Sequence, residues 1–178
     1  MSPPRLGSCW ALLLCALGCE SSDVGAPCVP EEEYREDFAG FSADEVYIES
    51  RSFQCESRLC LANHFQGRVS CPYGQSDEQA ASDPRCRLPG GGEPVRVGVP
   101  AQLLDRRAED TVYCSCRCDG PDPSARYCEC PSGFSCERLV PGFARTDAEL
   151  TGSYCVREGT RYAGTSGAVC DRTTANCE

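Results

Sequence analysis

The sequence carries seventeen cysteines in 178 residues, and fourteen of them fall between Cys28 and Cys177. Cysteine thiolates bind soft metals, act as nucleophiles or pair in disulfides, so any chemistry of this chain is expected to involve them. The densest group is Cys114, Cys116 and Cys118, followed by Cys128 and Cys130. This C-x-C spacing could present thiolates to zinc or copper(I). One hypothesis is therefore a metal-sequestering protein that uses these five residues in reduced form.

Disulfide pairing is the competing interpretation of the same cysteines. Structural zinc sites usually combine C-x(2–4)-C pairs with a second pair or with histidines. No C-x-x-C occurs here, which also removes the simplest motif of thiol–disulfide oxidoreductases. We therefore expect disulfides, with no catalytic residue and no metal or other cofactor. The expected disulfide residues are Cys28, Cys55, Cys60, Cys71, Cys86, Cys114, Cys116, Cys118, Cys128, Cys130, Cys136, Cys155, Cys170 and Cys177.

Residues 1–18 have the features of an export signal. Arg5 and the amino terminus form a short positive region, and an apolar run of nine residues extends from Cys9 to Leu17. This run is too short to cross a bilayer as a helix, which needs about 20 residues, but it is typical of a signal peptide. Residues 16–19, Ala-Leu-Gly-Cys, resemble the lipobox of bacterial lipoproteins. The resemblance implies that Cys19 is diacylated on its sulfur and becomes the mature N-terminus.

The number of remaining cysteines favours lipidation of Cys19. With Cys19 acylated, fourteen cysteines remain, and this even set can pair completely. Ordinary cleavage after Gly18 would leave one odd thiol on a soluble secreted protein. Cleavage after Ala26 would also leave an even set, but it would place Pro27 just past the cut. We therefore expect a lipid-anchored protein of the cell envelope, on the outer membrane or cell surface, or a secreted protein if it is not lipidated.

Composition predicts a small disulfide-rich fold, mainly β with short hairpins, much irregular chain and little helix. Cysteine makes up about 9% of the mature chain, at the threshold for a disulfide scaffold. Leu, Ile, Val and Phe together make up about 16%, below the ~20% that a chain needs to form a core unaided. All seventeen basic residues are arginine, and the formal net charge is −10. We expect no nucleic-acid partner, because phosphate binding requires a basic face.

The chain divides into a tether and one scaffold. Residues 19–27 are small and polar, and they are predicted to form a flexible tether after the lipidated cysteine. Residues 28–178 form a single cysteine-rich scaffold in which Gly90–Gly92 separates two lobes, 28–89 and 95–178. Five cysteines lie in the first lobe and nine in the second. Because both numbers are odd, complete pairing requires at least one disulfide between the lobes.

Alternation of apolar and polar residues predicts several short strands. The clearest covers residues 111–118, with Val112, Cys114, Cys116 and Cys118 on one face. A second strand at 127–130 is expected to complete a cysteine-rich hairpin with it. The other expected elements are strands at 46–48, 59–65, 68–71 and 95–99, a short helix or an acidic turn at 30–35, and irregular chain over the last 40 residues.

Two further resemblances concern a nine-residue segment and the chain as a whole. Residues 128–136, Cys-Glu-Cys-Pro-Ser-Gly-Phe-Ser-Cys, resemble the closing segment of an EGF-like module, in which a C-x-C hairpin precedes Gly and an aromatic residue. A generic disulfide-stapled turn is the alternative for this segment. The whole chain resembles uncharacterised cysteine-rich lipoproteins of myxobacteria, through its signal-plus-cysteine layout, its arginine-only basic residues and the stretch 52–74. This resemblance implies no activity.

His64 is the only histidine, so a Ser-His-Asp or Cys-His site would have to use it. It falls in a predicted strand without a G-x-S-x-G motif nearby, which favours a surface or structural role. The acidic residues 31–37 are expected to form a solvated face. The loops Asp119–Ser124 and Gly90–Gly92 are the candidate contact surface.

The sequence therefore predicts an exported, lipid-anchored protein that serves as a non-enzymatic binding or structural module. Its expected partners are the membrane, through the anchor on Cys19, and an unidentified protein or surface ligand. The alternatives are the metal-sequestering protein and a soluble secreted disulfide-rich protein. A small hydrolase that depends on His64 has the least support.

Overall fold

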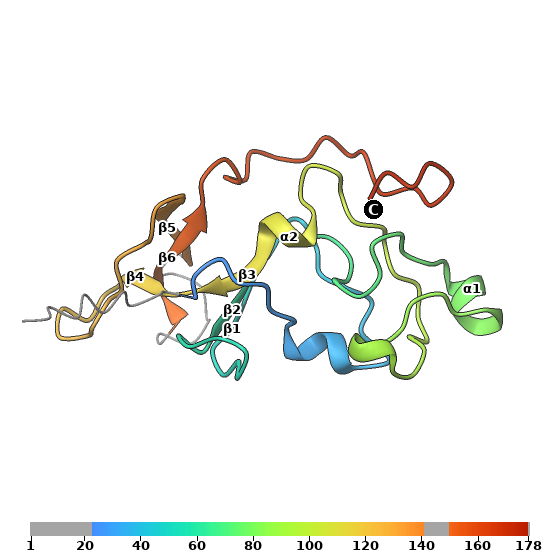
Figure 1. Ribbon diagram of the computed structural model, residues 1–178, viewed down its shortest axis with the longest axis horizontal. Coiled ribbons are helices and arrows are strands. Elements are labelled where there is room, and N and C mark those ends of the chain that lie inside the picture. Colours follow the sequence, from blue (N-terminus) through green and yellow to red (C-terminus); the bar gives the residue numbers. More distant parts are fainter. Residues whose placement is uncertain (1–22, 141–149, 178) are drawn as a thin grey trace, which may run out of the picture.

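Two small antiparallel sheets occupy one end and the middle of the computed structural model, which describes residues 23–140 and 150–177. Figure 1 shows an elongated molecule, with the second sheet at one end, the first sheet in the middle and helix α1 at the other end. The C-terminal segment runs along one long edge back toward α1. The predicted export signal, residues 1–18, and the predicted lipidation site, Cys19, lie outside the described residues. The predicted fold class, small, disulfide-rich and mainly β, is confirmed.

The first sheet has the order β1-β2-β3, with β1 Val46–Glu49, β2 Leu59–Asn63 and β3 Val112–Ser115. Both pairings are antiparallel, and Cys60 of β2 lies opposite Cys114 of β3. β2 ends at Asn63 because His64 adopts the left-handed conformation, with φ of 51°. The strands expected at 46–48 and 59–65 are thus present, with the second two residues shorter than predicted.

The second sheet has the order β4-β6-β5, with β4 Arg117–Asp119, β5 Phe134–Val140 and β6 Gly152–Arg157. The expected partner of β4, residues 127–130, is not a strand, and β6 pairs with β4 in its place. The prediction of irregular chain over the last 40 residues is therefore wrong for β6. Although Gly and Ser surround β6 in the sequence, β6 is the buried central strand of this sheet. Its neighbours β4 and β5 complete its backbone hydrogen bonds.

The strand expected at 111–118 divides into three elements. Thr111 ends α2 (Ala108–Thr111), and a break at Cys116 separates β3 from β4. All four residues of β3 are buried, so its alternation does not separate an inner face from a solvent face. Ser115 explains why: its hydroxyl donates a hydrogen bond to the Cys155 carbonyl of β6, which covers the face opposite Val112 and Cys114.

The helical elements are short. η1, a 3-10 helix at Glu31–Tyr34, follows Pro30, at the place where the sequence predicted a short helix or an acidic turn. η2 (Pro89–Gly91) lies in the glycine-rich loop. α1 (Asp77–Ser82) was not predicted, although its capping box is present in the sequence: Ser76 accepts a hydrogen bond from the Gln79 amide, and the Gln79 side chain accepts one from the Ser76 amide.

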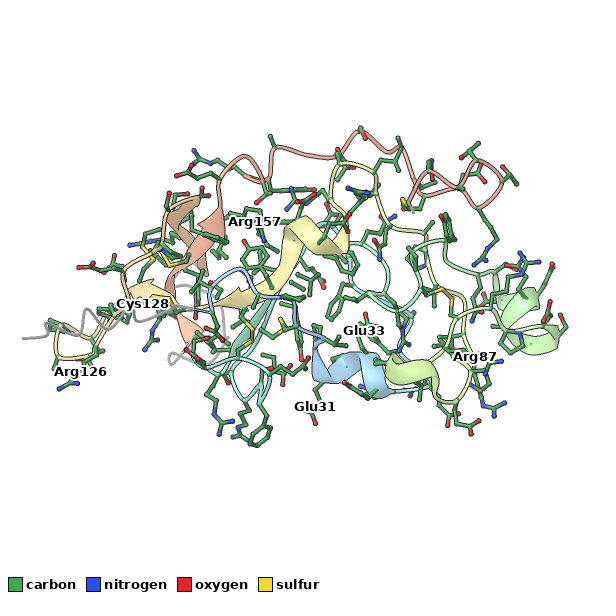
Figure 2. The ribbon with its side chains drawn as sticks, viewed as in Figure 1. Glu31, Glu33, Arg87, Arg126, Cys128 and Arg157 are labelled. Carbon is green, nitrogen blue, oxygen red and sulfur yellow. A yellow bond between two sulfur atoms is a disulfide. The ribbon has the colours of Figure 1, made fainter. Side chains whose placement is uncertain are left out.

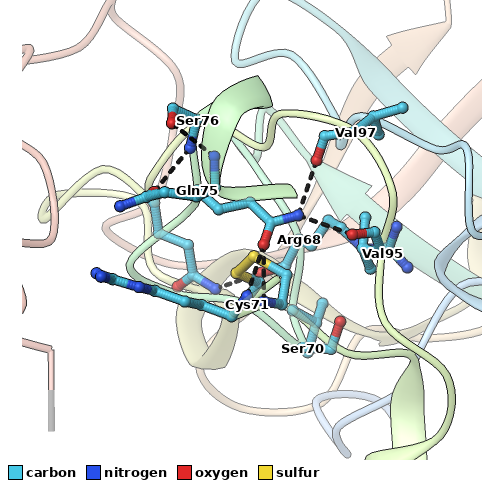
Figure 3. Close-up of a disulfide and its surroundings, with 12 residues drawn as sticks. Arg68, Ser70, Cys71, Gln75, Ser76, Val95 and Val97 are labelled. Carbon is cyan, nitrogen blue, oxygen red and sulfur yellow. Dashed lines mark hydrogen bonds between the residues drawn. A yellow bond between two sulfur atoms is a disulfide. The ribbon is translucent and has the colours of Figure 1, made fainter. Parts of the chain in front are cut away.

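Disulfides form part of both hydrophobic clusters. The cluster at the first sheet contains four cysteines together with Ala62, Phe65 and Val112. The other cluster contains Cys71, Cys86, Val95 and Val99. Figure 3 shows how Gln75 braces this second cluster: its amide nitrogen donates to the Val95 and Val97 carbonyls, at 2.9 and 2.8 Å. Each core is too small to stand alone, so the covalent links supply what apolar burial lacks.

Both predicted lobes contribute residues to the second hydrophobic cluster and to the first sheet. The second cluster draws Cys71 and Cys86 from residues 28–89, and Val95 and Val99 from residues 95–178. Likewise, β3 from the later part of the chain completes the sheet that β1 and β2 begin. The two parts therefore meet along the sheet and in the cluster, and the link at Gly90–Gly92 is an exposed turn.

The predicted tether is shorter than residues 19–27. Gly25 donates its amide to the Cys114 carbonyl, and Cys114 donates its own amide to the Ala26 carbonyl, both at 2.8 Å. Pro27 forms an antiparallel bridge with Tyr113. Residues 25–27 thus lie along the edge of β3, because that edge offers unpaired backbone groups. Of the predicted tether, residues 19–22 lie outside the described residues.

Candidate functional site

All fourteen cysteines from Cys28 to Cys177 are paired. The pairs are Cys28–Cys60, Cys55–Cys114, Cys71–Cys86, Cys116–Cys128, Cys118–Cys136, Cys130–Cys155 and Cys170–Cys177. Cys55–Cys114 is the one that joins residues 28–89 to residues 95–178, as the odd cysteine numbers require. It links the loop after β1 to the middle of β3, so it ties the first sheet together across its hydrogen bonds.

Three of the disulfides gather around the second sheet. Cys118–Cys136 joins β4 to β5, and Cys130–Cys155 joins residue 130 to β6. Cys116, in the break between β3 and β4, is bonded to Cys128, which is labelled in Figure 2. The Cys155 sulfur lies 3.6 Å from the Cys116 sulfur and 3.8 Å from the Cys128 sulfur, although neither is its disulfide partner. Residues 128–130 are therefore held to the sheet by disulfides instead of by a strand ladder.

The five cysteines of the metal hypothesis do not form one group. Cys114 belongs to a sulfur cluster with Cys28 and Cys55, while the other four are divided between two clusters at the second sheet. Within each cluster the three sulfur atoms lie within 4.8 Å of one another. Every one of these sulfurs is bonded in a disulfide, so metal binding would first require reduction, because thiolates are the ligands.

His64 is fixed by two contacts at the end of β2. Its Nδ1 lies 2.9 Å from the Ala43 carbonyl oxygen, and its ring stacks on Tyr162 with centroids 3.8 Å apart. Burial, together with the charge of Arg106, lowers the pKa of the imidazole below its usual 6.5, although the Ala43 carbonyl opposes the shift. Nδ1–H therefore donates to Ala43, and no hydroxyl or thiol nucleophile bonds to this ring among the described residues. The geometry corresponds to a structural histidine.

A cleft of about 490 Å³ lies next to His64, between the end of β2, strand β5 and residues 161–162. Asn63 lines it and is only 1% exposed, and neither atom of its side-chain amide has a hydrogen-bond partner. Arg106 holds the walls together, because its guanidinium donates to the carbonyls of Asn63, His64 and Thr160. The cleft offers polar groups to a ligand but shows no catalytic pair.

The acidic segment 31–37 is only partly the solvated face that the sequence predicts. Glu33 is fully buried, and Figure 2 shows its side chain within the fold while Glu31 lies at the surface. The Glu33 carboxylate receives hydrogen bonds from the Val69 amide, the Ser70 hydroxyl and the guanidinium of Arg68, which is also fully buried. Glu33 is therefore a structural anchor. Its place in a run of glutamates gave no sign of this.

The two candidate contact loops differ in construction. Residues 121–124 are exposed and form a turn in which the Asp122 carboxylate accepts hydrogen bonds from the amide and hydroxyl of Ser124. These bonds lower the pKa of the Asp122 carboxyl. Gly90 and Gly91 both adopt positive φ and have open space around them. Neither loop contributes a residue to the lining of the His64 cleft.

Sequence reasoning missed the residues with the most exposed aromatic surface. Phe53, in the connection between β1 and β2, is 87% exposed, and Tyr34 at the end of η1 is 53% exposed. Both line a shallow depression with Glu49 and Arg51. Isolated apolar residues inside a loop have no periodic pattern, so no sequence signal marks them.

Comparison with known proteins adds no assignment: no protein family, curated protein or solved structure matches this chain. Within residues 23–140 and 150–177, no helix has the length and apolar character that a membrane span requires.

Proposed function

We propose that this chain is an exported protein, anchored to a membrane by lipid on Cys19, that acts as a non-enzymatic binding or structural module at the cell envelope. The observation that carries the proposal is the complete pairing of the fourteen cysteines that follow Cys19. Disulfides persist in oxidising compartments and are rare in the cytosol, which supports export. Cys19 is left outside this set, and acylation gives it a use that requires no thiol partner.

The non-enzymatic part of the proposal rests on His64 and on the disulfides. The imidazole is hydrogen-bonded to the Ala43 carbonyl and stacked on Tyr162, and the cysteines are paired with one another in disulfides. A scaffold held by seven cross-links presents rigid loops, which lowers the entropy lost when a partner binds. The cleft beside Asn63 and the loops at Asp119–Ser124 and Gly90–Gly92 are its candidate binding surfaces.

Metal sequestration is the second candidate, because one observation favours it: cysteine sulfurs form three clusters of three, and within each cluster the sulfurs lie within 4.8 Å of one another. In that case the native protein would contain alkylatable thiols. Counting thiols in the native protein with an alkylating reagent therefore separates the two functions. We expect none to react.

The mass of the detergent-extracted mature protein, measured before and after reduction, tests the proposal. We expect an acylated N-terminal Cys19 and a gain of fourteen hydrogens on reduction, two for each of seven disulfides. The matched control is Cys19→Ser, which should keep the disulfides and lose the acyl mass and the membrane association. An unlipidated wild-type N-terminus would replace this proposal with the soluble secreted protein.

A further inference from the structure

The N-terminal end of the described chain, at Asp23, is fixed close to the connection between β1 and β2. The Glu56 amide in this connection donates a hydrogen bond to the Asp23 carboxylate. Beyond Asp23, Gly25 and Ala26 are hydrogen-bonded to β3 through Cys114. Asp23 is therefore a fixed point of the folded protein, and it is the described residue nearest in sequence to the proposed anchor at Cys19.

The length of chain between this point and the anchor limits the distance to the membrane. Cys19 precedes Asp23 by four residues, and an extended chain spans at most about 3.6 Å per residue, so the two Cα atoms lie within about 14 Å of each other. The acyl chains begin at Cys19 itself. A protein anchored there is therefore held with the surface around Asp23 next to the lipid headgroups, and it is not free to extend far from the bilayer.

The connection between β1 and β2, residues 50–58, carries side chains suited to that environment. We call it the aromatic loop. Phe53 is 87% exposed, and the Arg58 guanidinium lies 4.3 Å from the centroid of its ring. Arg51 and Arg58 are both exposed. Aromatic rings favour the boundary between headgroups and acyl chains, while arginine extends its charge to the lipid phosphates.

The aromatic loop is held in place by several bonds. The Ser52 amide donates to the Arg58 carbonyl, and the Arg58 amide donates to the Cys55 carbonyl, each at 3.0 Å. Cys55 is linked to β3 by its disulfide, and the Gln54 side chain forms two hydrogen bonds with the backbone of Val29. Phe53 therefore projects from a rigid support although water surrounds most of its surface. Burial of the ring would remove apolar area from water at little cost in loop entropy.

We propose that the aromatic loop is a second, protein-based contact with the membrane, in which Phe53 enters the headgroup boundary and Arg51 and Arg58 meet lipid phosphate. This inference rests on the proposed lipidation of Cys19. The contact fixes the orientation of the scaffold on the bilayer. As Figure 1 shows, the segment before the C-terminus lies on the opposite long edge from the connection between β1 and β2, so that edge faces away from the membrane.

Tryptophan fluorescence tests this contact directly, because the only tryptophan of the chain, Trp10, lies in the signal segment. Lipidated protein carrying Phe53→Trp is reconstituted in vesicles of phosphatidylethanolamine and phosphatidylglycerol. We expect its emission to shift to shorter wavelength, and lipids brominated near the headgroup to quench it by at least about half. The matched control is Val169→Trp, in the segment before the C-terminus, where the native residue is 43% exposed; its emission should stay that of a solvent-exposed indole.

The outcomes separate the two proposals. If the protein floats with the vesicles while the Phe53→Trp variant shows the same emission and quenching as the Val169→Trp variant, the membrane contact of the aromatic loop is refuted and the lipid anchor stands. If lipidation is absent and the protein does not float, both proposals fall. Both positions are exposed, so neither substitution removes core packing, and the mass gain on reduction verifies that the disulfides of each variant are intact.

Discussion

At the scale of single residues, the polar contacts of Arg68 and Arg106 stabilise a chain that has little hydrophobic packing. Arg68 and Glu33 form the only salt bridge in the described part of the chain whose two side chains are both fully buried. Arg68 also donates to the backbone carbonyls of Arg35 and Phe38, at 3.1 and 2.8 Å. Arg106 joins three further carbonyls from two distant segments. In both cases one guanidinium donates hydrogen bonds to several backbone carbonyls that would otherwise be buried without a donor.

Arg68→Met should strongly destabilise the protein, because it leaves the Glu33 carboxylate buried without its cation. Breaking a buried pair in this way costs about 3–5 kcal/mol. Urea unfolding with the disulfides intact measures the loss. The control is Arg96→Gln, which removes an exposed pair with Glu36 and should cost less than about 1 kcal/mol. Equal losses in the two variants would show that the Arg68–Glu33 pair contributes no more than a surface pair.

His64 should titrate below pH 6.5 in the folded protein, because burial and Arg106 disfavour its charged form. Between the folded and the unfolded pKa, the unfolded chain then binds more protons, so the free energy of unfolding falls as the pH drops below about 6.5. Because the chain has one histidine, its imidazole signals in a proton NMR titration report this pKa without ambiguity. A midpoint at or above 6.5 would contradict the prediction, and His64→Gln should remove this part of the pH dependence.

At the scale of elements, the sequence reveals those whose pattern is local. Alternation identified β1 and β2, and Pro30 with its following acids marked the start of η1. β6 was missed because its neighbours in the sequence are Gly, Ser and Thr, while its burial comes from β4 and β5 on either side. The pairing of residues 25–27 with β3 was missed for the same reason, since it depends on an edge that only the folded sheet offers.

At the scale of elements, we predict that the capping box of Ser76 and Gln79 stabilises helix α1. Ser76→Ala removes the side chain that caps the helix and should destabilise α1 by about 1 kcal/mol. Amide hydrogen exchange along residues 77–82 measures this locally, as faster exchange than in the wild type. Ser82→Ala is the control, because Ser82 lies at the other end of α1 and bonds only to the Glu78 carbonyl. Faster exchange in the control, but not in Ser76→Ala, would show that the capping box does not stabilise the helix.

At the scale of the whole molecule, the disulfides act over very different lengths of chain. Cys55–Cys114 joins residues 59 apart and links the loop before β2 to β3, whereas Cys170–Cys177 closes a loop of residues seven apart near the C-terminus. A cross-link stabilises mainly by restricting the unfolded chain, and the effect grows with the length of the loop. The long-range disulfides are thus expected to hold the elongated molecule together, while the short ones order its ends.

Replacing both cysteines of a pair with serine tests this ranking. Loop entropy predicts a loss of about 4 kcal/mol for Cys55→Ser with Cys114→Ser, and about 2.5 kcal/mol for Cys170→Ser with Cys177→Ser. Urea unfolding of the two double variants, under non-reducing conditions, measures the difference. The opposite order would indicate that native contacts around the C-terminal loop, and not chain entropy, determine what these disulfides contribute.

The sequence by itself determined that an even set of cysteines would staple a mainly β chain with too little apolar residue for a conventional core, and that at least one disulfide would cross from residues 28–89 to 95–178. Those conclusions follow from composition and parity, which do not depend on the path of the chain. Only the tertiary structure decided which cysteine meets which, since a disulfide requires Cα atoms about 4.4–6.8 Å apart in space. It also decided that Glu33 is buried and that residues 25–27 lie along β3, because the partners of both are distant in sequence.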